Sequence, residues 1–198
     1  MLLKELVKNL NEYLQSSLFQ DYCPNGLQVE GSKDVKKLAF GVSASLNVID
    51  QAVEQQADCL IVHHGIFWKG DDFCVVGSKK KKLQKLLENG ISLIAYHLPL
   101  DAHQDIGNNW YAAKQLGWKN LEPFGDIGVK GELEGVSCKD FKLSLEEYYQ
   151  HKAHTALGGA PTIHKAALIS GGAYKEISLA SDLGLDAFIT GNFDEPAW

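Results

Sequence analysis

The chain opens with apolar residues spaced as on one face of a helix. In MLLKELVKNLNEYL, leucine and valine recur every three or four positions, with lysine, glutamate and asparagine between them. This period predicts an amphipathic helix rather than a signal peptide. No apolar run in the sequence approaches the ~18 residues that a membrane span needs. We therefore expect no membrane partner.

Two later segments share one pattern of apolar and polar positions. Residues 35–64 read as a strand, a turn, a helix and a second strand, which together make a βαβ unit. Residues 163–192 follow the same pattern without a gap at an offset of 128 residues, so that Asp186 matches Asp58. Because the predicted element boundaries coincide as well, we interpret the two segments as duplicated half-domains.

The stretch between the two repeats contains three further regular elements. A helix is expected over residues 78–89, with Ser78 as its N-cap, and a buried strand over residues 91–96. A second helix is expected over residues 106–116, before Gly117.

We expect one family domain over residues 1–198, made of two similar lobes. The first lobe covers residues 1–120, a connecting insert covers 121–160, and the second lobe starts within 161–198. Strands that alternate with helices predict an α/β fold with mostly parallel sheets. Such sheets bind ligands beyond the carboxyl ends of their strands, so we expect one site at these ends, between the lobes.

Composition and charge narrow the classes of function. The chain is 45% hydrophobic and 22% charged, which is typical of a globular protein. Its net charge of -6 argues against a nucleic-acid partner, and the basic run Lys79–Lys82 reads as the solvated start of a helix. The four cysteines form no C-x-x-C pair, which predicts reduced, buried thiols and a cytoplasmic protein.

Two adjacent histidines end the second strand of the first βαβ unit, in the stretch IVHHGIFWKG. Imidazole nitrogens bind zinc, iron, manganese and nickel. Because neighbouring strand residues point to opposite faces, His63 and His64 can share one metal only if the strand breaks at Gly65. Each could instead bind a different ion of a close pair, or one or both could be hydrogen-bonded structural histidines.

A second polar cluster follows the expected strand ISLIAY, in HLPLDAHQDIGNN. Pro99 predicts an extended loop here, because proline disfavours a helical conformation of the residue before it. A carboxylate such as Asp101 close to a histidine such as His97 suits a catalytic metal site. Asp101 could instead cap a helix or turn, and we interpret His103 and Asp105 as solvent-exposed side chains.

Other residues could line a site or serve only the fold. Asn25 and Gln28, in DYCPNGLQVEG, follow a turn and either line a pocket or begin a strand. Trp68 and Phe67 could stack on a planar base, although packing against the sheet edge is the more common role of such aromatics. Cys59 is interpreted as a core residue.

Four stretches together resemble a known family. DYCPNGLQVEG, IVHHGIFWKG, YHLPLDAHQDIGNN and DAFITGN, in this order, resemble the dinuclear metal-centre proteins named GTP cyclohydrolase 1 type 2 homologues. The resemblance implies that His63, His64 and Asp101 are metal ligands and that His97 lines the same cavity. It also implies two divalent ions per subunit, with zinc, iron and manganese as candidates, a fold of two similar lobes, and a ring-shaped homohexamer.

The leading functional hypothesis is a divalent-metal-dependent hydrolase, cyclohydrolase-like or phosphoesterase-like, that acts on a small nucleotide-like substrate. The alternative is a non-catalytic metal-binding or assembly protein. The sequence assigns no catalytic residue. In the family, a later segment with a histidine followed after three residues by a glutamate supplies the remaining ligands, whereas this sequence stops at Trp198. We therefore expect the chain to lack the C-terminal end of the family domain and to bind metal weakly.

Overall fold

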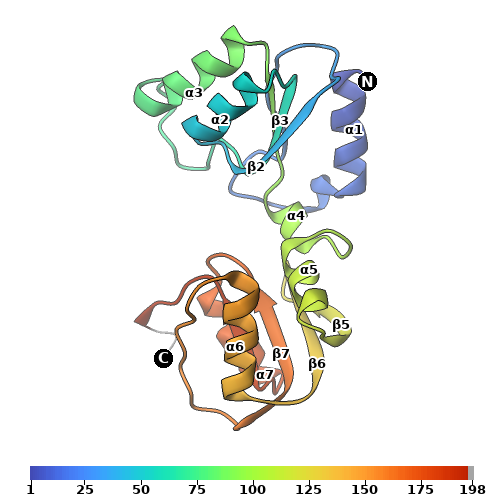
Figure 1. The fold of residues 1–198 in the computed structure, drawn as a ribbon, viewed down its shortest axis with the longest axis vertical. Helices are drawn as coiled ribbons and strands as arrows, with labels where there is room; N and C mark the ends of the chain where they lie inside the picture. The colour runs from blue at the N-terminus through green and yellow to red at the C-terminus, as the bar shows by residue number, and fades with distance from the viewer. Residues whose placement is uncertain (196–198) are drawn as a thin grey trace. The chain divides into compact units, whose positions relative to one another are not determined.

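The computed structural model describes residues 1–195 and divides the chain into two compact units, Met1–Leu100 and Asp101–Trp198 (Figure 1). Each unit has its own four-stranded sheet with helices, so the expected α/β fold of two similar lobes is confirmed. The first lobe was expected to end at residue 120, whereas the first compact unit ends at Leu100. In the described part of the chain, no helix combines the length and apolar character needed to cross a membrane.

The first unit contains a mixed sheet in the order β1-β4-β3-β2. Strand β3 pairs in parallel with β2 on one side and with β4 on the other, whereas β1 pairs antiparallel with β4. The elements of this unit are α1 (Leu3–Tyr13), η1 (Ser16–Leu18), β1 (Gly26–Val29), β2 (Leu38–Ser43), α2 (Leu46–Glu54), β3 (Cys59–His64), α3 (Gly77–Glu88), β4 (Ser92–Ala95) and the start of α4 (Leu98–Ala102).

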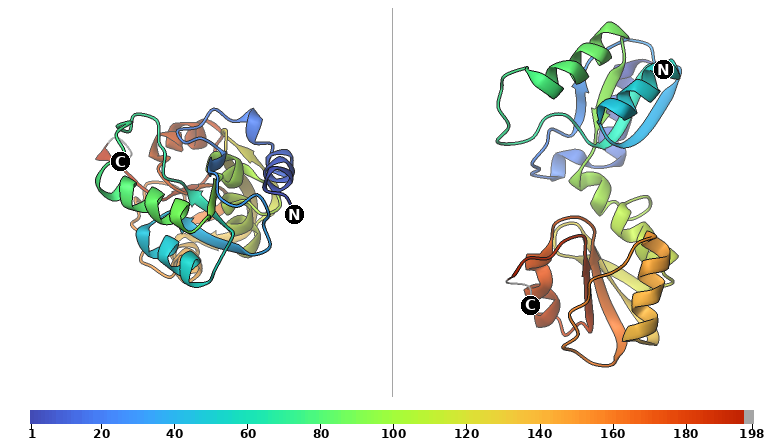
Figure 2. Two further views of the ribbon diagram at one scale, coloured as in Figure 1. Left: turned by 90° about the horizontal axis from the view of Figure 1, so that it is seen from above. Right: turned by 60° about the vertical axis from the view of Figure 1, so that its left-hand side comes forward.

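Helices cover both faces of the first sheet. One core cluster joins α2 and α3 to the sheet through Ile49, Leu60 and Leu86, all 0% exposed. A second cluster joins α1 to the opposite face, with Cys59 and Ile94 at its centre. Figures 1 and 2 show this arrangement, with α1 across the sheet from α2 and α3. The first helix of the chain therefore forms as predicted and buries its apolar stripe.

The second unit has a sheet in the order β5-β6-β7-β8. Here β7 and β8 are parallel, but β5–β6 and β6–β7 are antiparallel, so parallel pairing does not predominate in this sheet. Its elements are α5 (Asn108–Gln115), β5 (Lys119–Phe124), β6 (Gly128–Ser137), α6 (Cys138–Tyr149), β7 (Thr162–Ile169), η2 (Tyr174–Glu176), α7 (Ile177–Asp182) and β8 (Ala187–Thr190).

The residues expected to form a connecting insert, 121–160, belong to the second sheet. They supply most of β5, all of β6 and helix α6, whose Phe141 packs in the core with Trp118 and Val129. The alternating apolar and polar residues of β6 are interrupted by Gly131 and Gly135, which weaken a strand pattern. The insert is therefore part of the lobe and not a connection between lobes.

The two βαβ units have the same strand register at the predicted offset of 128 residues. Leu38 pairs with Cys59 in the first unit, and Ala166 pairs with Ala187 in the second. One carboxylate clamps each unit at its start. Asp58 accepts hydrogen bonds from the backbone N–H groups of Lys36 and Lys37, both at 2.8 Å. Asp186 accepts the equivalent bonds from the backbone N–H groups of His164 and Lys165, at 2.8 and 2.9 Å. The shared clamp supports duplication.

Two local predictions were wrong. Ser78 does not cap α3, because the helix starts at Gly77 with Val76 as its N-cap. The segment around Pro99 is not an extended loop but the helix α4. Pro99 is the second residue of that helix, where a backbone N–H has no intrahelical acceptor, so the missing N–H costs no hydrogen bond.

We predict that Asp58→Ala and Asp186→Ala each destabilise their unit by about 1–2 kcal/mol at pH 7, since each leaves two backbone N–H groups without their acceptor. Backbone hydrogen bonds from Lys36 and Lys37 lower the pKa of the folded Asp58 carboxyl. Its contribution is therefore present above the unfolded pKa, about 4, and is lost as the pH falls through the folded value. Urea unfolding from pH 7 down to about pH 3 measures this loss.

The control for these variants is Asp182→Ala, which changes an exposed carboxylate at the end of α7. Its effect should stay within about 0.5 kcal/mol at every pH. Equal effects of Asp58→Ala and Asp182→Ala would contradict the role of the clamp.

Candidate metal centre

His63 and His64 end β3 at the edge of the first sheet where its parallel strands finish. Pairing of β3 with β4 stops at Val62, opposite Ala95, whereas pairing with β2 continues to His64, opposite Ser43. At this end of the strand the two imidazoles nevertheless lie side by side. Their ring centroids lie 4.5 Å apart, and both side chains are half-buried. The adjacent histidines therefore converge although the strand runs through both.

The neighbouring strands orient both rings. His63 Nδ1 lies 3.0 Å from the carbonyl oxygen of Tyr96, to which it donates, and His64 Nδ1 lies 2.9 Å from Ser43 Oγ. A hydrogen bond at Nδ1 fixes the rotation of an imidazole and, when that nitrogen donates, its tautomer. Nε2 is then the nitrogen through which each ring could bind a metal. Histidine ligands in metal sites are usually held in this way.

His97 brings a third imidazole into the same place from the segment after β4. Its ring centroid lies 5.0 Å from that of His63 and 5.7 Å from that of His64. One ring nitrogen from each of the three histidines lies within 4.8 Å of the other two. Three protein ligands plus an open position are the usual donor set of a catalytic zinc ion. These side chains, called the histidine cluster below, therefore fit a divalent metal.

Asp21 holds His97 in its orientation. The Asp21 side chain is only 2% exposed, and its carboxylate lies 2.7 Å from His97 Nδ1. It also accepts hydrogen bonds from Asn25 Nδ2 and the backbone N–H of Leu98, both at 2.9 Å. Burial alone would raise the pKa of the Asp21 carboxyl, but these hydrogen bonds and the charge of His97 together lower it. Asp21 is therefore a charged acceptor that points His97 at its neighbours.

Sequence reasoning missed this role of Asp21. The signal available was an acidic residue two positions before the Cys-Pro-Asn turn of DYCPN. A single carboxylate in a turn has no periodicity, and turns are rich in aspartate for local reasons. Its importance becomes visible only when the fold brings it beside a histidine 76 positions away.

Asp21, Cys23 and His97 also place potential ligand atoms within 4.8 Å of one another. The carboxylate of this trio already accepts hydrogen bonds, as described above. Burial, helped by the nearby Asp21 charge, raises the pKa of the Cys23 thiol to about 12. Metals bind the thiolate and not the thiol, so we assign no metal to this second group.

Asn25 and Gln28 lie beside the cluster and support it. Asn25 Oδ1 accepts a hydrogen bond from the backbone N–H of His97 at 2.8 Å. The amide of Gln28 spans two loops, with Nε2 donating to the Pro24 carbonyl at 2.9 Å and Oε1 accepting from the Ile66 N–H at 2.8 Å. Through these hydrogen bonds, Asn25 and Gln28 hold the segment that contains Asp21 against the residues that follow β3 and β4.

Gly65 has a different role from the one expected. A Cβ at this position would lie 2.2 Å from Gln28 Oε1, so glycine is needed for the close approach of the Gln28 amide. The strand does not need to break there for the imidazoles to meet.

The two aromatic residues after the histidines have separate environments. Trp68 contacts the cluster, with its ring edge-on to His97 at 5.1 Å and 5.9 Å from His64. Phe67 instead packs against the core of the first unit, with Lys79 Nζ 5.9 Å from its ring centroid. Trp68 thus remains a candidate to contact a ligand, and Phe67 serves the fold.

Asp101 begins the second unit and is 4% exposed, with Oδ1 accepting a hydrogen bond from Asn108 Nδ2 at 2.7 Å. Its convergence with His63 and His64 stays a prediction.

His103 and Asp105 were both expected to be exposed to solvent. Asp105 is exposed, but His103 is half-buried. Its Nδ1 accepts hydrogen bonds from the backbone N–H groups of Asp105 and Ile106, at 3.3 and 3.4 Å.

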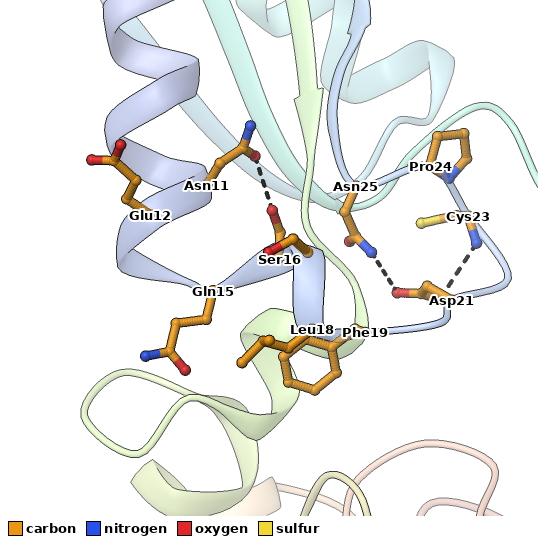
Figure 3. Close-up of a pocket in the computed structure, with 11 residues that line it drawn as sticks. Asn11, Glu12, Gln15, Ser16, Leu18, Phe19, Asp21, Cys23, Pro24 and Asn25 are labelled. Atoms are coloured by element: carbon orange, nitrogen blue, oxygen red, sulfur yellow. Dashed lines mark hydrogen bonds between the residues drawn. The ribbon is translucent and has the colours of Figure 1, made fainter.

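An open hollow of about 750 Å³ adjoins Asp21 on the first unit (Figure 3). Asn11, Gln15 and Asn25 contribute polar groups to it, and Leu18 and Phe19 contribute apolar ones. Its volume lies within the usual range of ligand pockets. The cluster histidines are not among the residues that line it, and Asp21 and Asn25, which both bond to His97, connect the hollow to the histidine cluster.

Comparison with known proteins gives consistent matches over the whole chain. Residues 1–198 match the family described as Duf34/NIF3 (NGG1p interacting factor 3). A protein of Chlamydia muridarum named GTP cyclohydrolase 1 type 2 homolog is 52% identical over 200 residues, covering 98% of this chain and 80% of the relative.

Two solved structures share the fold. Protein ybgI superimposes with a TM-score of 0.95 at 39% identity, covering 100% of this chain and 81% of that one. TTHA1606 from Thermus thermophilus superimposes with a TM-score of 0.89 at 35% identity, covering 99% and 80%. Part of each similar protein thus lies outside the match.

All four cysteines are free, as expected, but only Cys23 and Cys59 are buried. We predict that Ellman's reagent reacts fastest with the exposed Cys74, more slowly with Cys138, and with Cys23 and Cys59 only after unfolding. Burial raises the pKa of the last two thiols to about 12, which removes the reactive thiolate near pH 8.

The measurement is the time course of thiol release at pH 8 in native buffer and in denaturant. Cys74→Ser should remove the fast phase and leave the total in denaturant lower by one thiol. Rapid labelling of Cys23 in the native protein would contradict the burial of its thiol, which is at the wall of the hollow but only 4% exposed.

We predict that Gly65→Ala destabilises the protein by about 1–3 kcal/mol, because its methyl group would overlap the hydrogen-bonded amide of Gln28. In a Gln28→Ala background the clash is absent, so the added cost of Gly65→Ala should fall by about 1 kcal/mol or more. Urea unfolding of the four proteins in this cycle provides the coupling free energy. The same cycle with the exposed Gln84→Ala should show no coupling, and coupling of equal size there would refute the explanation.

Proposed function

The chain belongs to the Duf34/NIF3 family, and on that premise we propose that it is a divalent-metal-dependent hydrolase acting on a small nucleotide-like substrate. The observation that carries the proposal is the histidine cluster, in which three ring nitrogens lie within 4.8 Å of one another. The cluster lies at the carboxyl ends of the parallel strands β2, β3 and β4. This is the edge of the sheet at which α/β proteins bind their ligands.

The donor set supports a metal of borderline softness. His63, His64 and His97 would hold it through ring nitrogens, and zinc, iron and manganese all accept such ligands. A divalent ion bound there would polarise a carbonyl or phosphoryl oxygen and acidify water. We further propose that Asp101 contributes a carboxylate and that the complete centre holds two ions, as the family resemblance implies.

The chain's own residues would prepare the site. Asp21 would hold the proton on His97 Nδ1, and Nε2 of His97 would then be the nitrogen that binds a metal with the other two imidazoles. Trp68 presents an aromatic wall beside His64 and His97. A planar base could stack on this wall, since such contacts favour flat, polarisable ligands. The hollow next to Asp21 is large enough for a nucleotide-sized ligand.

The names of the relatives support a nucleotide-like substrate, because several are named GTP cyclohydrolase 1 type 2 homolog. Cyclohydrolase-like and phosphoesterase-like activity use the same metal chemistry and differ in the bond that is cleaved. We propose a cytoplasmic location and a homo-oligomeric assembly, with the hexamer implied by the resemblance as the expected form.

We predict that His63→Ala, His64→Ala and His97→Ala each weaken zinc or manganese binding at least about tenfold. Asp21→Asn keeps every ligand atom but loses the orientation of His97, and should weaken binding about ten- to a hundredfold. Calorimetric titration of the 198-residue chain with each metal measures both effects. The matched control is His151→Ala, which removes an exposed histidine outside the cluster.

Turnover of a panel of nucleotides and phosphoesters then separates the candidate functions. Loss of both metal and turnover in the cluster variants, with His151→Ala unchanged, supports the hydrolase. Tight metal binding without turnover on any substrate would favour the non-catalytic metal-binding protein. Unchanged metal affinity in all three cluster variants would refute the site assignment itself.

A further inference from the structure

The peptide unit between Tyr96 and His97 is hydrogen-bonded at both of its ends. Its carbonyl, on Tyr96, accepts the bond from His63 Nδ1 at 3.0 Å. Its N–H, on His97, donates to Asn25 Oδ1 at 2.8 Å. Because a peptide unit is planar and its carbonyl and N–H point in opposite directions, these two bonds hold one rigid plane from opposite sides.

The residue before this plane has little freedom of its own. Tyr96 is 2% exposed, and its ring packs in the core cluster between α1 and the sheet. Its N–H donates to the Val62 carbonyl at 3.1 Å, and its hydroxyl donates to Asn11 Oδ1 at 2.8 Å. The sheet and α1 therefore hold Tyr96, and the bonds to His63 and Asn25 set the rotation of the peptide that follows it.

The amide of Asn25 matches its two partners in one orientation only. Oδ1 faces a backbone N–H, which can only donate, and Nδ2 lies 2.9 Å from the Asp21 carboxylate, which can only accept. Figure 3 shows this amide directed at Asp21. Asn25 is half-buried, so a side chain without the amide oxygen would leave the His97 N–H without its acceptor in a partly buried place. Such a loss destabilises the local conformation.

We propose that Asn25 is a positioning residue that sets the orientation of His63 and His97 together, although it is hydrogen-bonded only to the second. Its bond fixes the plane of the shared peptide. The carbonyl of this plane fixes the ring of His63, and the same plane leads to the Cα from which the His97 ring extends. The proposal rests on the histidine cluster of the proposed function, in which both rings would be metal ligands.

The other orienting groups act on one ring each. Ser43 bonds to His64 from β2, at 2.9 Å, without involving the shared peptide. Asp21 bonds to the ring of His97, at 2.7 Å, and to neither of the other two imidazoles. Two ligands that depend on one peptide should lose their geometry as a pair, whereas His64 should keep its own.

The first test is the exchange of the His63 Nδ1 proton with water, followed by nuclear magnetic resonance in metal-free protein with isotope-labelled histidine. The signal is assigned by its loss in His63→Ala. Asn25→Ala should speed this exchange about five- to tenfold, a ratio that corresponds to the net contribution of one hydrogen bond. Unchanged exchange in Asn25→Ala would overturn the proposal.

The matched control is Gln28→Ala, which also removes an amide with two hydrogen bonds from the same segment but bonds to neither end of the shared peptide. It should leave the exchange of the His63 proton within about twofold. Equal acceleration by Gln28→Ala and Asn25→Ala would mean that only the attachment of the segment matters, against the proposal. Urea unfolding checks that the variants fold. Asn25→Ser, whose hydroxyl is too short to bond both partners, replaces Asn25→Ala if that variant does not.

The second test is zinc affinity, measured by calorimetry of the 198-residue chain. Asn25→Ala should weaken zinc binding about ten- to a hundredfold. In a His63→Ala background the loss should be smaller by about threefold or more, since one of the two affected ligands is already gone, and in a His64→Ala background it should be unchanged. A loss of equal size in all three backgrounds would contradict the shared role of the peptide.

The two tests separate this proposal from the proposed function. The exchange measurement needs neither metal nor turnover. Faster His63 exchange in Asn25→Ala, in a protein that binds no zinc in any form, would support the positioning role of Asn25 and count against the metal-dependent hydrolase. Zinc binding and turnover with unchanged exchange would do the reverse.

Discussion

The parallel pairing of β3 with β2 and β4 is the constraint on which the candidate metal centre depends. Three neighbouring strands that run the same way end at the same edge of the sheet, so His63, His64 and His97 meet although they are up to 34 positions apart in the chain. The same strands supply the groups that orient the rings, since Ser43 lies at the end of β2 and the Tyr96 carbonyl lies just past β4. The sheet therefore fixes both the positions and the rotations of the imidazoles, which is what a preorganised site requires.

The buried carboxylate of Asp21 adds a second constraint. A charge that is 2% exposed is tolerated only when donors surround it, and here the donors come from His97, Asn25 and the first residue of α4. The orientation of His97 and the conformation of the segment around Asp21 are thus stabilised by the same hydrogen bonds. Removing either partner would leave the other buried without its bond, so the fold of this segment and the geometry of the site are coupled.

The sequence was sufficient for the features that repeat or alternate, and insufficient for those that depend on contacts between distant residues. The βαβ units were predictable because apolar periodicity and an internal repeat agreed, and the histidine pair was predictable as a polar end to an apolar strand. The place of β5 and β6 in the second sheet was missed because glycines and charged residues obscure their alternation, so that this region was interpreted as a connecting insert. The helix at Pro99 was missed because the rule against helix before proline neglects the tolerance of the first turn. Asp21 had only the weak signal of an acidic residue near a turn, and the role of Gly65 required the position of Gln28.

Duplication explains how one supersecondary unit came to serve two purposes. At the strand end equivalent to His63 and His64, the second unit has Gly191 and Asn192, and a Cβ on Gly191 would lie 2.8 Å from Gly171 N. Backbone closes that end, so there is no room for an imidazole. The two units also differ in the strand beside the first strand of each βαβ unit. In the second sheet β7 pairs with β6, whereas in the first sheet β2 is the last of the described strands. The two copies of the unit therefore differ at the carboxyl end of their second strand, and the first copy is the one that leaves room there for the imidazoles of the histidine cluster.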